Sequence, residues 1–187
     1  MVRCGLNNHT MKTKTITLYD YSELSKEAKE KARAKWNETN DDPFMQSHMI
    51  NLLKEKLEER GIKYDTDSMD VRYSLSYSQG DGFMFEGTLY PNGKRVTIKH
   101  ADAHYYHSRT ASFNYDTEEA QGNLGDFSET MTEKEQDAFE EEYRAICTEM
   151  EQAGYDEIEY QQSEEVFEEQ CDGNEWTFRE DGTLENV

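Results

Sequence analysis

The sequence has little of what divides, crosslinks or anchors a protein chain. Only two prolines occur among its 187 residues, so no proline-rich linker separates parts of it. Its three cysteines, Cys4, Cys147 and Cys171, are too widely spaced for a disulfide framework or a paired zinc-binding motif. No apolar run approaches the roughly 20 residues that span a bilayer, and the N-terminal residues lack the apolar segment of a secretory signal. We therefore expect a cytoplasmic protein with free thiols and no membrane contact.

Basic residues are scarce in the last two-fifths of the chain. Residues 113–187 contain 25 aspartates and glutamates but only three basic residues, whereas residues 1–112 are close to neutral. The formal net charge of −21 therefore arises almost entirely after residue 112. Because such a surface repels a phosphate backbone, we do not expect it to bind nucleic acid directly.

Aromatic residues, by contrast, are abundant. The mean hydropathy of −1.07 favours disorder, but twelve Tyr, eight Phe and two Trp favour a packed core. The length fits one domain, which we place at residues 13–187 after a flexible tail of residues 1–12. Within this domain, residues 13–112 form a near-neutral part of helices and strands, and residues 113–187 form a strongly acidic helical part.

The spacing of apolar residues and the capping signals predict the helices. Ser25 can cap a helix that begins at residue 26. A second helix is expected from Phe44 to the glycine at position 61, with an apolar stripe of Phe44, Met49 or Ile50, Leu53 and Leu57. A third, acidic helix is expected over 132–153, opened by a Thr-x-x-Glu capping box and ended by Gly154. A short helix follows Ser163.

Alternating apolar residues predict the strands. The expected strands are 13–21, 71–77, 83–90, 94–100 and 104–115, with a small hairpin around Asp181 near the C-terminus. We expect an α+β fold, in which a central antiparallel sheet of four to five strands is flanked by the N-terminal helices and an acidic C-terminal helical section.

Four stretches resemble a family of phage and prophage proteins that are often labelled antitoxins of toxin–antitoxin systems. They are "YSELSKEAKEKARAKW", "SLSYSQGDGFMFEG", "HYYHS" and "GNEWTFREDG". The resemblance covers most of residues 14–183, and the Ser-Gln-Gly-Asp-Gly stretch is its sharpest motif. It implies a phage-associated, cytoplasmic α+β protein of a bacterial host and brings no established chemistry with it.

The Gly80-Asp81-Gly82 triplet allows two interpretations. Glycines suit a tight turn with positive φ, so a β-hairpin accounts for the triplet. Alternatively, Asp81 could hold a zinc or manganese ion with three nearby histidines, His100, His104 and His107, in a small hydrolase with Glu86 as its base. Asp102 is a further carboxylate close to these histidines.

The acidic part also allows two interpretations, a solvated surface or a binding face. On a helix, carboxylates on neighbouring turns lie about 5–6 Å apart, and such an array resembles the phosphates of a duplex, so it would attract a basic nucleic-acid-binding groove. The candidate partner-binding residues are Glu140, Glu141, Glu142, Glu149, Glu151, Glu164, Glu165, Glu168 and Glu169.

The first function predicted is therefore that of an interaction protein without enzymatic activity or cofactor. It would bind and inhibit a basic host protein, such as a nuclease or another defence protein that handles nucleic acid. The alternatives are the metal-dependent hydrolase and an antitoxin that neutralises a co-encoded toxin.

Overall fold

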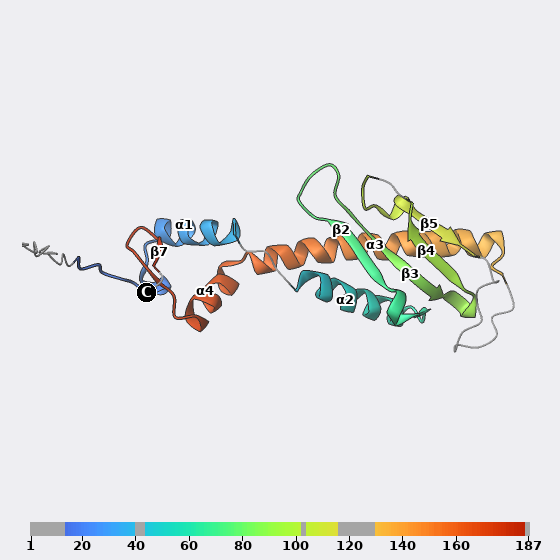
Figure 1. Cartoon of the computed structure of the whole chain (residues 1–187), viewed down its shortest axis with the longest axis horizontal. Coiled ribbons are helices and arrows are strands. Elements are labelled where there is room, and N and C mark those ends of the chain that lie inside the picture. The colour runs from blue at the N-terminus through green and yellow to red at the C-terminus, as the bar shows by residue number, and fades with distance from the viewer. Residues whose placement is uncertain (1–13, 40–43, 102–103, 116–129, 186–187) are drawn as a thin grey trace, which may run out of the picture. The chain divides into compact units, whose positions relative to one another are not determined.

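A computed structural model describes residues 14–39, 44–101, 104–115 and 130–185 (Figure 1). The chain divides into two compact units. Unit 1 combines the described residues of Met1–Asn40 with those of Gln161–Val187, and unit 2 is Asp41–Tyr160. Among the described helices, none is both long and apolar enough to cross a membrane.

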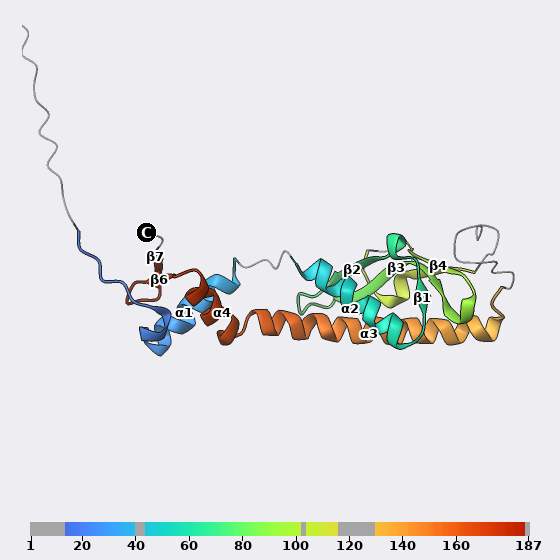
Figure 2. The same cartoon turned by 90° about the horizontal axis from the view of Figure 1, so that it is seen from below.

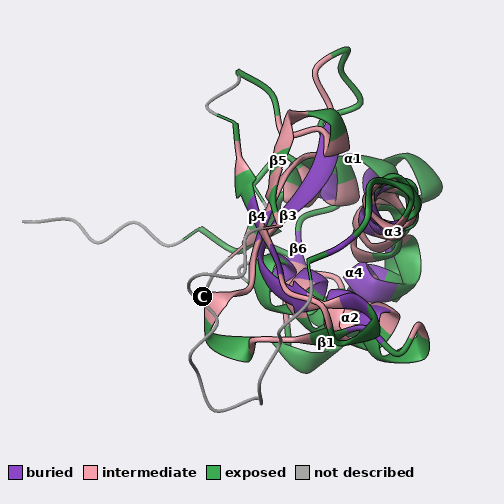
Figure 3. Cartoon of the chain, turned by 90° about the vertical axis from the view of Figure 1, so that its right-hand side faces the viewer, coloured by how far each residue is buried: buried purple, intermediate pink, exposed green. Residues whose placement is uncertain are grey.

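Unit 2 is built on an antiparallel sheet of five strands. The strands are β1 (Lys63–Tyr64), β2 (Asp70–Ser74), β3 (Gly82–Tyr90), β4 (Val96–His100) and β5 (Ala111–Asn114). β3 is the central strand, since it pairs with β2 and β1 along one edge and with β4 along the other, and β5 then pairs with β4. It is also the most continuously buried strand (Figure 3).

Two helices of unit 2, α2 (Met45–Glu59) and α3 (Glu133–Gln161), pack on one face of this sheet (Figure 2). Met49, Leu53 and Leu57 of α2 are fully buried, as the predicted stripe requires. The Tyr143 hydroxyl of α3 donates to the Phe85 carbonyl oxygen at 3.0 Å and accepts from the Phe85 N–H at 3.2 Å, so it occupies polar groups of the central strand.

Unit 1 contains α1 (Lys26–Asn37), α4 (Glu164–Gly173), β6 (Thr177–Phe178) and β7 (Leu184–Glu185). The side chain of Ser25 caps α1, as predicted, and that of Ser163 caps α4 at the start of the short helix expected there. The strands form the expected hairpin, with Gly182 at a φ of 80°. The core of unit 1 joins the two segments of the unit through aromatic rings. The ring centroids of Tyr21 and Phe167 lie 5.0 Å apart in an edge-to-face arrangement.

The α+β prediction is confirmed, and so are the helices that begin after Ser25, near residue 44 and after Ser163. The structure corrects the end of the long helix. α3 does not stop at Gly154 but continues to Gln161. A Cβ at Gly154 would lie 2.5 Å from Cδ1 of Leu75, so glycine is needed here for close packing and not for termination.

Three further expectations were wrong. Of the described residues in the predicted strand 13–21, only Tyr19 pairs, in an isolated bridge with Phe178. The predicted strand 104–115 shortens to Ala111–Asn114, and a loop and a 3-10 turn precede it. Phe44 is 73% exposed and does not join the apolar stripe of α2.

Candidate functional site

The acidic residues of α3 are partly neutralised by the protein's own cations. Arg60, at the end of α2, binds Glu142 at 2.5 Å through Nε and Glu149 at 2.6 Å through Nη2. Glu140 binds Arg144 one turn further along α3 at 2.7 Å. Two other candidate residues of this helix form no ion pair with a described side chain: Glu141 and Glu151.

The acidic residues of α4 are much less compensated. Glu164 lies 3.8 Å from Arg33 of α1. No described cation pairs with the remaining three, which are exposed or half-buried: Glu165, Glu168 and Glu169. The nine candidate residues thus divide between two helices that belong to different units. The four candidate carboxylates that belong to unit 1 all lie on α4.

Asp81 organises the loop between β2 and β3. Its Oδ1 accepts hydrogen bonds from the hydroxyls of Ser74, Ser76 and Ser78 at 2.9–3.0 Å. Its Oδ2 accepts from the backbone N–H groups of Ser76 and Ser78 and from the hydroxyl of Tyr155 on α3, all within 2.9 Å. Desolvation raises the pKa of Asp81, but these bonds outweigh it and hold the pKa well below its ordinary value. Asp81 therefore acts as a structural acceptor, and serines at every second position are the sequence signal for it.

The hairpin prediction is confirmed, since β2 and β3 pair from Asp70↔Glu86 to Ser74↔Gly82. The reason predicted for the glycines was wrong, because neither Gly80 nor Gly82 has a positive φ; Tyr77 has one, at 58°. Both glycines instead allow the 104–107 loop to approach. A Cβ at Gly82 would lie 2.3 Å from Nδ1 of His107, and one at Gly80 would lie 2.8 Å from Cε1 of Tyr105.

The residues of the predicted metal site do not converge. Among the described residues, no three His, Cys, Asp or Glu side chains are placed to hold a metal ion. His104 packs against the Tyr105 ring at 4.7 Å, and Nε2 of His100 lies 3.2 Å from the Tyr105 carbonyl oxygen. Asp102 lies outside the described residues.

Both carboxylate oxygens of Glu86, the predicted base, already accept hydrogen bonds. It accepts from the His100 backbone N–H at 2.6 Å and from Nε of Arg72 at 2.6 Å. Desolvation raises the pKa of Glu86, but these two donors outweigh that effect and lower it. A carboxylate kept ionised by two donors is a weak proton acceptor, so this arrangement does not favour hydrolysis.

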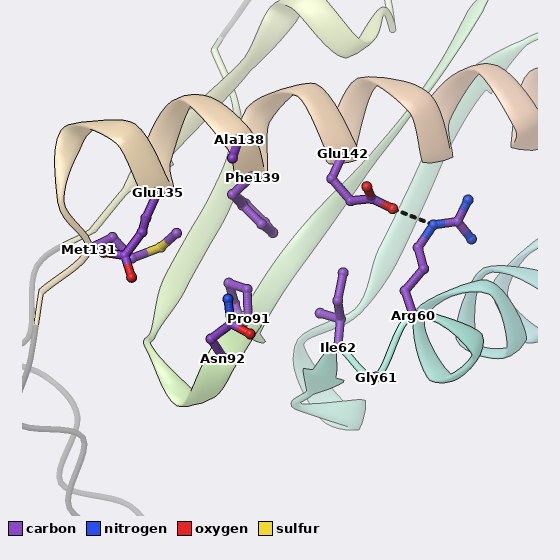
Figure 4. Close-up of a pocket in the computed structure, with 10 residues that line it drawn as sticks. All are labelled: Arg60, Gly61, Ile62, Pro91, Asn92, Met131, Glu135, Ala138, Phe139 and Glu142. Carbon is purple, nitrogen blue, oxygen red and sulfur yellow. Dashed lines mark hydrogen bonds and ion pairs between the residues drawn. The ribbon is translucent and has the colours of Figure 1, made fainter.

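A pocket of about 410 Å³ opens in unit 2 between α3, the end of α2 and the β3–β4 connection (Figure 4). Ile62, Pro91 and Phe139 form its apolar wall. Its charged residues already have partners, since Arg60 reaches across to Glu142, as Figure 4 shows, and Glu135 is bound by Lys94 outside the drawn set. Because these charged residues are already paired, the pocket provides little electrostatic attraction for a charged ligand.

Unit 1 contains a more apolar groove, of about 530 Å³. Trp36 of α1, Phe167 of α4, Trp176 before the hairpin and Phe178 of β6 supply aromatic walls, and Leu184 lies at its edge. The abundance of aromatic residues predicted a packed core that includes both tryptophans. They are only half-buried, because the groove leaves part of each indole open.

No protein-family model, curated protein or solved structure matches the chain. The function must therefore be argued from the chain's own geometry.

Proposed function

We propose that the protein is a non-enzymatic interaction protein that binds a basic, nucleic-acid-binding partner through α4. Its carboxylates would occupy the surface that the partner uses for nucleic acid, and the partner would be inhibited as a result. Following the phage resemblance, the proposed partner is a host nuclease or another defence protein; an antitoxin would use the same chemistry on a co-encoded toxin.

The observation that supports this proposal is the uncompensated row of carboxylates on α4. Acidic residues in the first turn of a helix interact favourably with the helix dipole and so stabilise the helix, which accounts for Glu164 and Glu165. Glu168 and Glu169 lie one turn further on, where they repel the first pair at i,i+4 and no described cation offsets them. Local helix stability does not explain this second pair, whereas binding to a basic surface does.

The charge of the whole unit agrees with such a partner. The described residues of unit 1 include fourteen acidic and seven basic residues. A field of one sign accelerates encounter with an oppositely charged surface and makes the association sensitive to salt. The proposed complex should therefore weaken steeply as ionic strength rises.

The test is capture of basic proteins followed by competition with DNA. The immobilised protein is incubated with a bacterial lysate fraction enriched on heparin, and each captured protein is purified and bound to a labelled duplex of about 20 base pairs. We expect the protein to displace the duplex. A charge-reversed α4 variant, E165K/E168K/E169K, should lose at least tenfold in affinity.

A matched variant controls for net charge. Three exposed acidic residues of unit 2 without a described ion pair are changed instead: Glu55→Lys, Asp137→Lys and Glu159→Lys. This variant alters the net charge by the same amount and should retain most of the binding. Equal losses in both variants would contradict the role of α4, and unchanged binding in both, or failure to displace the duplex, would contradict the proposal.

A further inference from the structure

Both tryptophans of the chain line the same groove. They are the only two tryptophans of the sequence, and with Phe167 they line one cavity of about 530 Å³. Both indoles pack against the ring of Phe167, with centroid distances of 5.1 Å for Trp36 and 6.3 Å for Trp176. A cavity of this volume is within the range of pockets that bind small molecules or single side chains.

Apolar residues also lie at the edge of the groove. Leu184 is 39% exposed there, and Ala32 and Ala34 of α1 add two small apolar side chains. Large aliphatic or aromatic groups left open to water gain free energy when a partner covers them. Aromatic residues in such pockets are the usual anchor points of protein interfaces.

The charges around the groove favour a cationic occupant. Two lysines lie at its rim, but each is neutralised within unit 1: Lys31 by Asp181 at 2.7 Å and Lys35 by Glu38 at 2.8 Å. The surplus charge of the unit is negative. An anionic ligand would therefore meet no free cation at the rim, whereas a basic segment is attracted by the unit as a whole.

α4 connects the groove with the acidic face. Phe167 is buried on the side of α4 that lines the groove, and its sequence neighbour Glu168 carries one of the uncompensated carboxylates. A partner segment that places an apolar side chain in the groove therefore brings an adjacent lysine or arginine toward Glu168, whereas Glu165 and Glu169 lie further around the helix. Complementary charge accelerates encounter and fixes orientation, and a buried apolar anchor adds binding energy.

We propose that this groove is the anchor site of the interface: it receives a large aliphatic side chain, such as leucine, from a basic segment of the partner. This inference rests on the proposed function, since the lysines and arginines that flank the anchor bind the α4 carboxylates. The groove adds the apolar binding energy that the acidic face cannot supply.

The test uses the intrinsic fluorescence of the full chain. With only two tryptophans, both in the groove, excitation at about 295 nm reports on groove occupancy alone. The probes are two capped 13-residue lysine peptides, one with a central leucine and one with a central alanine. At 150 mM NaCl we expect the leucine peptide to shift the tryptophan emission and to bind at least fivefold more tightly.

Two variants separate the groove from the charge. Ala34→Tyr fills the rim of the groove and should remove the preference for leucine while lysine-dependent binding persists; Ala145→Tyr, at an exposed alanine of α3, is the matched control and should behave as wild type. The E165K/E168K/E169K variant should weaken both peptides.

The outcomes distinguish the two proposals. Equal binding of both peptides to the wild type, with weakening by the α4 variant, would overturn the groove inference and leave the proposed function standing. Binding of neither peptide, or no effect of the α4 variant, would count against the proposed function itself. Tryptophan emission that changes with protein concentration alone, and no longer does so in Ala34→Tyr, would assign the groove to a second copy and overturn the inference.

Discussion

The hydroxyl of Tyr155 donates a 2.7 Å hydrogen bond to Oδ2 of Asp81, although 74 positions separate these residues in the chain. The ring of Tyr155 also packs against Tyr77 at 4.7 Å. Through these two contacts the loop between β2 and β3 docks on α3. Asp81, the residue that most resembled a catalytic or metal-binding group, is thus part of the scaffold.

The role of Asp81 predicts a specific dependence of stability on pH. Its pKa is lowered in the folded state from an ordinary value of 3.8, so its contribution is complete above about pH 4 and is lost as the pH falls toward the lowered value. Asp81→Asn should lower the melting temperature at pH 7, and the difference from wild type should shrink below about pH 4. Thermal denaturation followed by circular dichroism at several pH values measures this, with Asp137→Asn on the exposed face of α3 as control. A difference that is constant down to pH 3 would contradict the assignment.

The two glycines that flank Asp81 should differ in their tolerance of alanine. At Gly82 the added Cβ meets the His107 ring and the Tyr106 carbonyl oxygen at 2.8 Å, and a backbone atom cannot move alone. We expect Gly82→Ala to cost about 1–3 kcal/mol of unfolding free energy, as overpacking does. At Gly80 the added Cβ meets only the half-exposed ring of Tyr105, so Gly80→Ala should cost clearly less. Urea denaturation of both variants gives the comparison, and a larger loss for Gly80→Ala would refute it.

The contact between Gly154 and Leu75 can be tested with a double-mutant cycle. In an exposed helix, Gly→Ala stabilises by about 1 kcal/mol. In the wild type the Leu75 side chain opposes this gain, because the new Cβ would lie 2.5 Å from its Cδ1. Once Leu75→Ala has removed the obstacle, Gly154→Ala should become stabilising by up to about 1 kcal/mol. If Gly154→Ala has the same effect in both backgrounds, the two residues are not coupled.

The buried hydroxyl of Tyr143 should contribute measurably to stability. Tyr143→Phe removes the hydrogen bonds between this hydroxyl and the Phe85 N–H and carbonyl groups, and the loss of these buried bonds costs about 1–3 kcal/mol. Tyr160→Phe is the matched control, since Tyr160 is 53% exposed and should change the unfolding free energy little. Chemical denaturation distinguishes the two, and equal small effects would show that the Phe85 bonds are dispensable.

Local signals in the sequence were sufficient for most elements but not for their ends. Serine caps at Ser25 and Ser163 and the alternation in β2 and β3 are short-range features, so these elements were predicted correctly. Gly154 was misjudged because glycine serves both to end helices and to admit a neighbour, and the neighbour here, Leu75, is distant in sequence.

The candidate site was likewise predictable only in its local features. The sequence identified the acidic residues, but not which of them are neutralised, because Arg60 reaches Glu142 and Glu149 across more than 80 positions. The groove was not anticipated at all. In the sequence, one of its tryptophans precedes unit 2 and the other follows it, so no local pattern indicates that they lie together.

The assembly of unit 1 from two separated segments also orders events during synthesis. Unit 2 is one continuous stretch, so all of its residues are synthesised before the second segment of unit 1. Unit 1 must then join residues such as Lys31 and Asp181, which are 150 positions apart. The sheet can therefore form as soon as unit 2 is available, whereas the groove and the α4 face require the segment that is synthesised after it.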